Sequence, residues 1–280
     1  MYEKELFDET LDINSTNNYE ISIQVSLNGF SFSLLDTLRN KFVMMREYRL
    51  SGRENELATQ VEEIIFKDDF LGRQYHAYRL IYVFERNTLV PSGLFDPAVK
   101  DNYFTLNHNL EEGYLVANNR LDNPDSYILF DLRQDLQALL VKAFPDASQS
   151  HHIKPLLYSA FRTSAGNTAR HIQVNIEDTF FNLVVIESGR LEFFNTFRYR
   201  NASDILYYMM FTFEKLGISS KEPLYISGEV DYGDELHTNL SAYAANIKFL
   251  KPEGSFSLSY VFDPLSLHRY SNLFNIVNCV

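Results

Sequence analysis

The sequence has one cysteine, no tryptophan and no long apolar run. Because Cys279 stands alone, no disulfide and no thiolate metal cluster can form within one chain, which favours a reducing compartment. No segment approaches the ~18 consecutive apolar residues that a transmembrane helix needs. The first nineteen residues are acidic and polar, without the basic start and apolar stretch of a signal peptide. We therefore expect a cytoplasmic protein with no membrane span.

Basic residues are scarce relative to acidic ones. The chain has 37 Asp and Glu against 25 Lys and Arg, a formal net charge of -12. Affinity for a nucleic acid backbone comes mostly from Lys and Arg, so we expect no nucleic acid partner. The composition is otherwise that of a globular protein, since 45% of residues are hydrophobic and 18 Tyr and 23 Phe can fill a core.

Common catalytic and phosphate-binding motifs are also missing from the sequence. It contains no GxxxxGK[ST] loop, no GxGxxG loop and no G-x-S-x-G nucleophile turn. The most conspicuous histidine pair is His151-His152. Adjacent residues in an extended segment point to opposite faces, so we interpret the pair as one buried and one exposed histidine rather than a metal site.

The two halves of the chain carry a repeat. The segment IQVSL at 23–27 recurs as IQVNI at 172–176, an offset of 149 residues that also aligns Phe32 with Phe181 and Leu34 with Leu183. Residues 21–27 and 30–35 alternate apolar and polar side chains, as strands with one buried face do. Asn28-Gly29 between them predicts a two-residue type I′ hairpin turn, because both residues tolerate positive φ angles.

The same element types follow in both halves. A third strand is expected at 41–49 in the first half and at 190–199 in the second, where Ser188-Gly189 makes the turn. A helix then follows, with apolar residues on one face from Leu57 and from Ile205; Asn201 or Ser203 can cap the second helix and Gly217 can end it. Strands at 77–84 and 223–227 complete the order strand-strand-strand-helix-strand twice.

The remaining segments set the predicted domain limits. A strand at 127–130 and helices at 132–144 and 154–163 extend the first half, and Ser164 to Thr168 is the candidate hinge. We predict a flexible acidic N-terminal segment at 1–19, a first subdomain at 20–165 and a second at 166–280.

This order of elements resembles the tandem ribonuclease-H-like subdomains of the actin-like ATPase superfamily. Within it, the chain looks most similar to the cytoplasmic assembly proteins of type IV pili and type II secretion. The segments NTLVPSGLFD at 87–96 and 171–199 also resemble an uncharacterised family from the Bacteroides group, a domain of unknown function. The resemblance implies an α/β fold with two ribonuclease-H-like subdomains, mixed sheets and flanking helices, and it implies no assigned activity.

The superfamily's chemistry implies an acid near the end of the first strand of each half, followed by a tight turn that holds phosphate. Ser26 and Asn175 stand at those positions, so neither is a carboxylate. The first turn keeps Gly29, but the second offers Glu177 and Asp178 to the phosphate.

Two further features weaken a catalytic interpretation. In the superfamily that the chain resembles, adenosine is typically bound by a Gly-Gly turn after a strand of the second half. The matching region here has a single glycine, Gly228. A ribonuclease-H-like nuclease needs a carboxylate in its first strand, and residues 21–27 have none. We therefore expect no catalytic residue, no cofactor and no bound metal.

Two hypotheses for function remain open. The first is a non-catalytic scaffold that binds an unknown protein partner or itself; the helix around 207–211 is apolar nearly all round, so it is either buried on both sides or leaves one face for a partner. The alternative is binding of a small ligand, cation or nucleotide, with weak or no ATPase activity, in a cleft between the halves. The residues expected to line that cleft are Ser26, Asn28, Gly29, Asn175, Glu177, Asp178, Thr179 and Gly228.

Overall fold

The computed structural model describes residues 2–166 and 169–279, which form two compact units. Unit 1 runs from the N-terminus to Lys154 and adds Glu253–Leu265 and the segment from Leu273 onward; unit 2 holds Pro155–Pro252 and Ser266–Asn272. The chain therefore passes between the two units several times: it returns to unit 1 at Glu253, adds Ser266–Asn272 to unit 2 and ends in unit 1. Of the predicted hinge, Asn167 and Thr168 lie outside the described residues.

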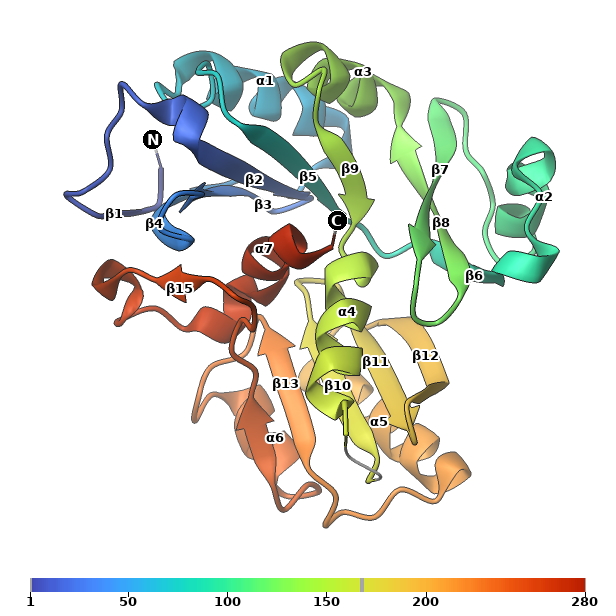
Figure 1. The fold of residues 1–280 in the computed structure, drawn as a ribbon. Helices are drawn as coiled ribbons and strands as arrows, with labels where there is room; N and C mark the ends of the chain where they lie inside the picture. Colours follow the sequence, from blue (N-terminus) through green and yellow to red (C-terminus); the bar gives the residue numbers. More distant parts are fainter. Residues whose placement is uncertain (1, 167–168, 280) are drawn as a thin grey trace. The chain divides into compact units, whose positions relative to one another are not determined.

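Unit 1 is built on a seven-stranded mixed sheet with the order β1-β4-β3-β2-β5-β9, and β15 pairs with β4 (Figure 1). Strands β2, β3 and β4 are antiparallel neighbours, whereas β5 and β9 run parallel to β2. The bounds are Lys4–Phe7 (β1), Tyr19–Ser26 (β2), Gly29–Asp36 (β3), Lys41–Arg49 (β4), Ala77–Val83 (β5), Ser148–His151 (β9) and Ser257–Leu258 (β15).

Apolar alternation explains why β2 takes this central place. Ile21, Ile23 and Val25 have no exposed surface and belong to one core with helices α1 (Leu57–Lys67) and α3 (Gln134–Ala143). Burying one such side chain stabilises the fold by about 1.5–3 kcal/mol. The period-two pattern of residues 21–27 therefore predicted a real strand with its apolar side on the helices.

The predicted hairpin between β2 and β3 is confirmed, but its predicted turn type is wrong. The loop consists of Leu27 and Asn28, neither of which has a positive φ angle, and Gly29 is already the first residue of β3. The Asn28 carbonyl accepts a hydrogen bond from the Leu50 backbone N–H at 2.9 Å, a distant contact that holds the loop in its own geometry. In the second half, Ser188 and Gly189 do have positive φ angles, as a type I′ turn requires.

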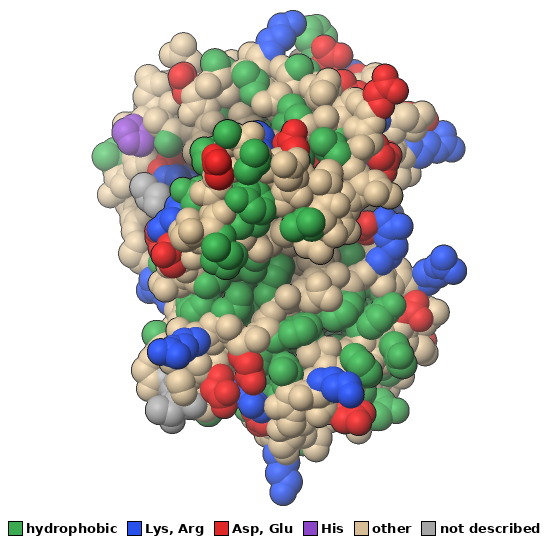
Figure 2. Space-filling model, turned by 90° about the vertical axis from the view of Figure 1, so that its right-hand side faces the viewer, with side chains coloured by type: hydrophobic (Ala, Val, Ile, Leu, Met, Phe, Trp, Pro, Cys, Tyr) green, Lys and Arg blue, Asp and Glu red, His purple; other side chains and the backbone are tan. Residues whose placement is uncertain are grey.

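A smaller antiparallel sheet with the order β6-β8-β7 is inserted into unit 1 between β5 and α3. Its strands are Asn87–Pro91 (β6), Tyr114–Leu121 (β7) and Ser126–Arg133 (β8), and helix α2 (Lys100–Thr105) shares a small core with them. Figure 2 views this side of the molecule, where apolar side chains reach the surface among charged ones. The exposed large apolar residues around α2 are Leu94, Val99 and Leu106.

The N-terminal residues form structure instead of the flexible segment that their composition suggested. They include β1, which pairs with β4, and the 3-10 turn Thr16–Asn18. The buried carboxylate of Asp8 accepts hydrogen bonds from Thr10, from the Lys41 ammonium at 2.9 Å and from the Ser259 hydroxyl. Burial raises the pKa of Asp8, but these hydrogen bonds outweigh that effect and hold the pKa well below its usual range. Most of these partners are distant in sequence, which is why local composition missed the order.

Both members of the histidine pair are buried, so the predicted exposed histidine is wrong. His151 and His152 have no exposed surface, and their ring centroids lie 4.4 Å apart. The Nε2 atom of His151 lies 3.0 Å from the Phe84 carbonyl oxygen, a contact that ties the end of β9 to the end of β5.

Unit 2 contains a five-stranded sheet with the order β12-β11-β10-β13-β14. Its strands are His171–Ile176 (β10), Phe180–Glu187 (β11), Arg190–Arg198 (β12), Leu224–Gly228 (β13) and Ile247–Phe249 (β14), and its helices are Ile153–Ser164 (α4), Ala202–Leu216 (α5) and Glu235–Ser241 (α6). The Asn201 side chain accepts the Asp204 N–H at the start of α5, and Gly217 ends it with a φ of +63°, as predicted. A short C-terminal helix, Ser271–Asn275 (α7), follows.

The duplicated topology is confirmed. In unit 1 the antiparallel strands β2, β3 and β4 lead through α1 to β5, which pairs parallel with β2; in unit 2 the strands β10, β11 and β12 lead through α5 to β13, which pairs parallel with β10. Ile23 and Ile172 occupy the first strand of each set, and both pair with a leucine of the parallel strand. Within the described residues, no helix combines the length and hydropathy required to cross a membrane.

Candidate functional site

The unit 1 part of the candidate site is the turn that joins β2 to β3. Ser26 is the last residue of β2, and its hydroxyl donates to the Asn28 side-chain oxygen at 2.9 Å and lies 3.1 Å from the Gly29 carbonyl oxygen. The Ser26 hydroxyl, the Asn28 side-chain oxygen and the Gly29 carbonyl are thus in contact within their own turn. A hydroxyl in this position supplies no negative charge to a metal ion.

Asn175 is the centre of the unit 2 part of the candidate site. Its side chain is 1% exposed; the oxygen accepts a hydrogen bond from the Ser227 hydroxyl at 2.9 Å, and the amide nitrogen donates to Glu177 Oε1 at 2.7 Å. Asn175 and Ser227 are register partners on the parallel strands β10 and β13. The amide therefore joins two strands and the following turn, and both of its polar atoms have partners.

The turn Glu177-Asp178-Thr179 is fixed at both ends by hydrogen bonds. The Glu177 N–H donates to the Phe180 carbonyl at 2.8 Å, and the Tyr199 hydroxyl donates to the Glu177 carbonyl at 2.6 Å. At the far end, the Tyr199 N–H donates to the Thr179 carbonyl at 3.0 Å. Asp178 and Thr179 are exposed, whereas the Glu177 side chain folds back beside Asn175.

The protonation of Glu177 differs from that of an ordinary surface carboxylate. Burial raises the pKa of Glu177 to about 8; the hydrogen bond from Asn175 opposes this rise, and the nearby carboxylates of Glu229 and Asp178 add to it. At neutral pH the protonated, uncharged form of Glu177 is therefore favoured.

We expect Glu177→Gln to change the pH dependence of stability. Because the folded-state pKa lies above the ordinary value of 4.5, the native state loses stability between pH 4.5 and about 8, where the unfolded chain has released the Glu177 proton and the native state has not; above about 8 the loss is complete. Thermal melts followed by circular dichroism should show similar Tm values for variant and parent at low pH, and a higher Tm for the variant in alkaline buffer. Glu214→Gln, an exposed acid on α5, is the control. An equal difference at both pH values contradicts the assignment.

Gly228 is required by a close approach of two backbones. Its φ is +86°, and a Cβ built on it would lie 1.9 Å from the Ile176 carbonyl oxygen. That same oxygen accepts the Glu229 N–H at 2.7 Å, so the end of β13 closes onto the end of β10. The sequence marked Gly228 as the remnant of a nucleotide-binding turn, and the structure gives it a role in packing.

Two residues that the sequence analysis missed also lie at the end of β13. Arg269 Nη2 lies 2.9 Å from a carboxylate oxygen of Glu229 and 3.5 Å from one of Asp231, and His268 Nε2 lies 2.6 Å from the Val230 carbonyl oxygen. Both come from the segment Ser266–Asn272 of unit 2, about forty residues downstream in the sequence. No local pattern connects them to β13, because the contact is purely tertiary.

The eight candidate residues thus form two separate sets of contacts. Ser26, Asn28 and Gly29 share one turn of unit 1, while Asn175, Glu177 and Gly228 meet at the strand ends of unit 2, with Asp178 and Thr179 in the exposed part of its turn. That the two sets line a common cleft remains a prediction. Across residues 2–166 and 169–279, no three His, Cys, Asp or Glu side chains are grouped so that they could hold a metal ion.

The apolar segment around 207–211 lies on helix α5. The sequence left open whether this helix is buried on both sides or has one exposed face. Ile205, Met209 and Phe213 are buried in the unit 2 core, whereas Tyr207 is 66% and Phe211 51% exposed. The two exposed rings stack with centroids 6.4 Å apart. One face of α5 is therefore left on the surface.

Comparison with known proteins agrees with this architecture. The profile of the family described as "Protein of unknown function (DUF3822)" matches residues 8–247. No curated protein matches the chain. A solved structure from Bacteroides thetaiotaomicron, described as a protein with actin-like ATPase fold and unknown function, is 19% identical, covers 97% of this chain and 100% of its own, and has a TM-score of 0.82.

A second similar structure is the PilM-PilN type IV pilus biogenesis complex. It is 10% identical, covers 93% of this chain and 96% of its own, and has a TM-score of 0.60. At such low identities these similarities show the fold alone. Together with the duplicated topology, the comparisons show that the chain belongs to the DUF3822 family of proteins of unknown function and has the actin-like ATPase fold.

Proposed function

We propose that this protein is a non-catalytic scaffold with an actin-like fold, which acts by binding another protein or a second copy of itself. One observation carries the proposal. Ser26, the last residue of β2, and Asn175, the residue before the last of β10, are not carboxylates, and both are hydrogen-bonded within their own unit.

Nucleotide hydrolysis places specific demands on these positions. Acidic side chains hold the Mg²⁺ ion and position the attacking water, and the catalytic effect comes from such positioned charges. Turning Asn175 toward a ligand would leave the buried Ser227 hydroxyl without its acceptor, at a cost of about 1–3 kcal/mol. The site would thus lose stability before it gained a metal ligand.

The charges around the unit 2 turn add a second obstacle. Asp178 is exposed, and Glu229 follows Gly228 directly in the sequence. A phosphate charge about 4 Å from a carboxylate is repelled by about 1 kcal/mol in water and about 4 kcal/mol at an effective dielectric constant of 20. Arg269 already pairs with Glu229, so its positive charge is partly neutralised and attracts a phosphate less strongly.

Support for the protein-binding part comes from the fold. The pilus protein of this fold occurs in a complex with a second protein, PilN. A protein with this fold can therefore be part of an assembly. The proposal transfers to this chain only the general role of binding another protein.

Isothermal titration of the full-length chain with ATP and Mg²⁺ tests the proposal. We expect no heat of binding, and we expect sedimentation velocity profiles to be identical with and without the nucleotide. ATP binding at micromolar affinity with turnover contradicts the proposal. Weak binding without turnover that Asn175→Ala abolishes would instead favour the alternative, a ligand site that includes the unit 2 turn.

A further inference from the structure

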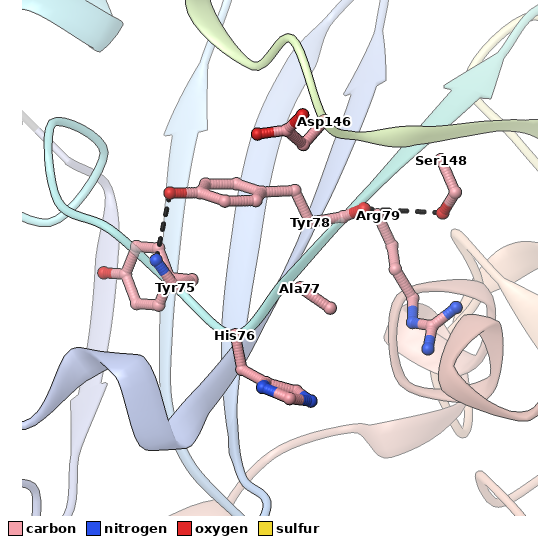
Figure 3. Close-up of a pocket in the computed structure, with 7 residues that line it drawn as sticks. All are labelled: Tyr75, His76, Ala77, Tyr78, Arg79, Asp146 and Ser148. Atoms are coloured by element: carbon pink, nitrogen blue, oxygen red, sulfur yellow. Dashed lines mark hydrogen bonds between the residues drawn. The ribbon is translucent and has the colours of Figure 1, made fainter.

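Unit 1 has two adjoining cavities at the edge of its main sheet where β5 and β9 begin. Their volumes are about 410 and 510 Å³, and both are bounded by Tyr75, Tyr78 and Asp146. Figure 3 shows the residues that line the smaller cavity. Ser26 lies at the other end of this sheet, since it pairs with Val83, the last residue of β5. The cavities are therefore separate from the candidate site described above, and their size suits a small organic ligand.

Aromatic rings form a fixed wall shared by the two cavities. The ring of Tyr78 packs against Tyr75 at a centroid distance of 5.7 Å and against Phe144 at 6.0 Å. The Tyr78 hydroxyl donates to the Arg73 carbonyl at 2.9 Å and accepts the Tyr75 N–H at 3.0 Å. Because the hydroxyl of Tyr78 already has its hydrogen-bond partners and Tyr75 and Phe144 are buried behind it, the wall is preformed, and the partly exposed Tyr78 supplies its apolar surface.

Two opposite charges line the larger cavity without neutralising one another. Among the described residues, the exposed carboxylate of Asp146 takes part in no hydrogen bond and no ion pair, and Arg73 takes part in no ion pair. The Arg73 guanidinium donates only to backbone carbonyls, those of Asp69 at 2.9 Å and Ile13 at 3.0 Å. These bonds hold the guanidinium in place and leave its charge uncompensated.

The other charged groups of the smaller cavity are Arg79 and His76. The guanidinium of Arg79 makes two hydrogen bonds to the Glu20 carboxylate, at 3.1 and 3.0 Å, and so is neutralised. His76 is exposed at the margin. The unmatched charges of the combined cavities are therefore one carboxylate and one guanidinium.

We propose that the two cavities form one binding site for a small zwitterion of the amino-acid type. Its ammonium group would bind Asp146, its carboxylate would bind Arg73, and its apolar side chain would lie against the partly exposed ring of Tyr78. Guanidinium groups recognise carboxylates with particular strength because their N–H donors match the two oxygens. A simple cation would be repelled by Arg73 and a simple anion by Asp146, so a ligand that carries both charges is selected.

The proposal is tested by titrating the full-length chain with L-phenylalanine and L-leucine, followed by calorimetry or by ligand-observed NMR. We expect saturable binding of at least one of them. Phenylalanine amide lacks the carboxylate and N-acetylphenylalanine lacks the ammonium group, and each should bind about tenfold more weakly than phenylalanine, a loss of about 1.4 kcal/mol. Absence of saturable binding for both amino acids, or equal binding of the blocked compounds, overturns the proposal.

A variant of Asp146 tests the placement of the ammonium group. Asp146→Asn should weaken phenylalanine binding about tenfold, equivalent to about 1.4 kcal/mol. It should leave N-acetylphenylalanine binding unchanged or tighter, because the repulsive charge is gone. Glu112→Gln, which removes another exposed acid of unit 1, is the matched control and should bind like the parent. Melting curves confirm that both variants are folded, and phenylalanine binding that Asp146→Asn does not alter overturns the assignment.

Discussion

Gly228→Ala is expected to destabilise unit 2 by about 4 kcal/mol or more, which places it among the most damaging single substitutions. A methyl group at this position would lie 1.9 Å from the Ile176 carbonyl oxygen, far inside van der Waals contact. The backbone must move apart to admit it, which breaks the 2.7 Å hydrogen bond from Glu229 to Ile176. Because whole domains are stable by only about 5–15 kcal/mol, the variant should unfold at much lower urea concentrations than the parent.

Gly233→Ala is the matched control for this prediction. Gly233 also lies in unit 2 and has a φ of +83°, but a Cβ built there meets no atom within 4 Å. Gly233→Ala should therefore lower the free energy of unfolding only by the cost of holding an alanine in the left-handed conformation, about 1–2 kcal/mol. Urea unfolding followed by circular dichroism measures both variants. If Gly228→Ala loses no more stability than Gly233→Ala, the close approach of β13 to β10 is wrong.

The second large effect is expected for Arg46→Ala in unit 1. The Arg46 guanidinium lies 2.9 Å from an Asp68 carboxylate oxygen, 2.7 Å from one of Asp69 and 2.5 Å from one of Glu5. The Asp68 side chain is completely buried, so removal of Arg46 leaves its carboxylate without a positive partner, held only by the Tyr48 hydroxyl and the backbone N–H groups of Phe70 and Leu71. Breaking a buried ion pair from one side typically costs about 3–5 kcal/mol.

Two aromatic rings add to the contribution of Arg46. Its guanidinium carbon lies 4.9 Å from the ring centroid of Tyr2 and 4.7 Å from that of Phe70. Arg53→Ala is the control, because Arg53 pairs with Glu56 at 2.9 Å while both side chains are largely exposed, and such pairs contribute at most about 1 kcal/mol. Amide hydrogen exchange in β3 and β4 reports on unit 1 directly. Similar protection in the two variants would show that the buried network contributes little.

Periodic patterns explain how much of the fold could be predicted from the sequence. The alternation in β2 and the capping residues Asn201 and Gly217 act within a few positions, and they placed the strands and α5 correctly. The type of the first hairpin turn was missed, since a contact from Leu50 holds that loop. Strand β7 was missed because the polar residues Asn118 and Asn119 interrupt its alternation, and β6 was missed because its five residues, NTLVP, are too few to show one.

The sequence predicted on which strands and turns the candidate residues lie, but not which side chains they contact. The duplication identified Ser26 and Asn175 as equivalent positions near the ends of two strands; Ser26 is the last residue of β2, and Asn175 is followed by one more residue of β10. Their partners were not predictable, because Ser227 reaches Asn175 through strand pairing and Tyr199 reaches Glu177 across the sheet. The protonation of Glu177 follows from burial, which no local pattern reveals.

The return of the chain to unit 1 has a consequence for the order of synthesis. Phe42 on β4 packs against Phe256 and Phe274, with ring centroids 4.9 and 4.8 Å away, and β15 extends the sheet beside it. A nascent chain that ends at Pro252 would thus carry Phe42 without either of these aromatic partners. The aromatic cluster around Phe42 is therefore completed only after Phe274 has been synthesised, later than the main core of unit 1, whose buried residues lie between Leu11 and Phe144.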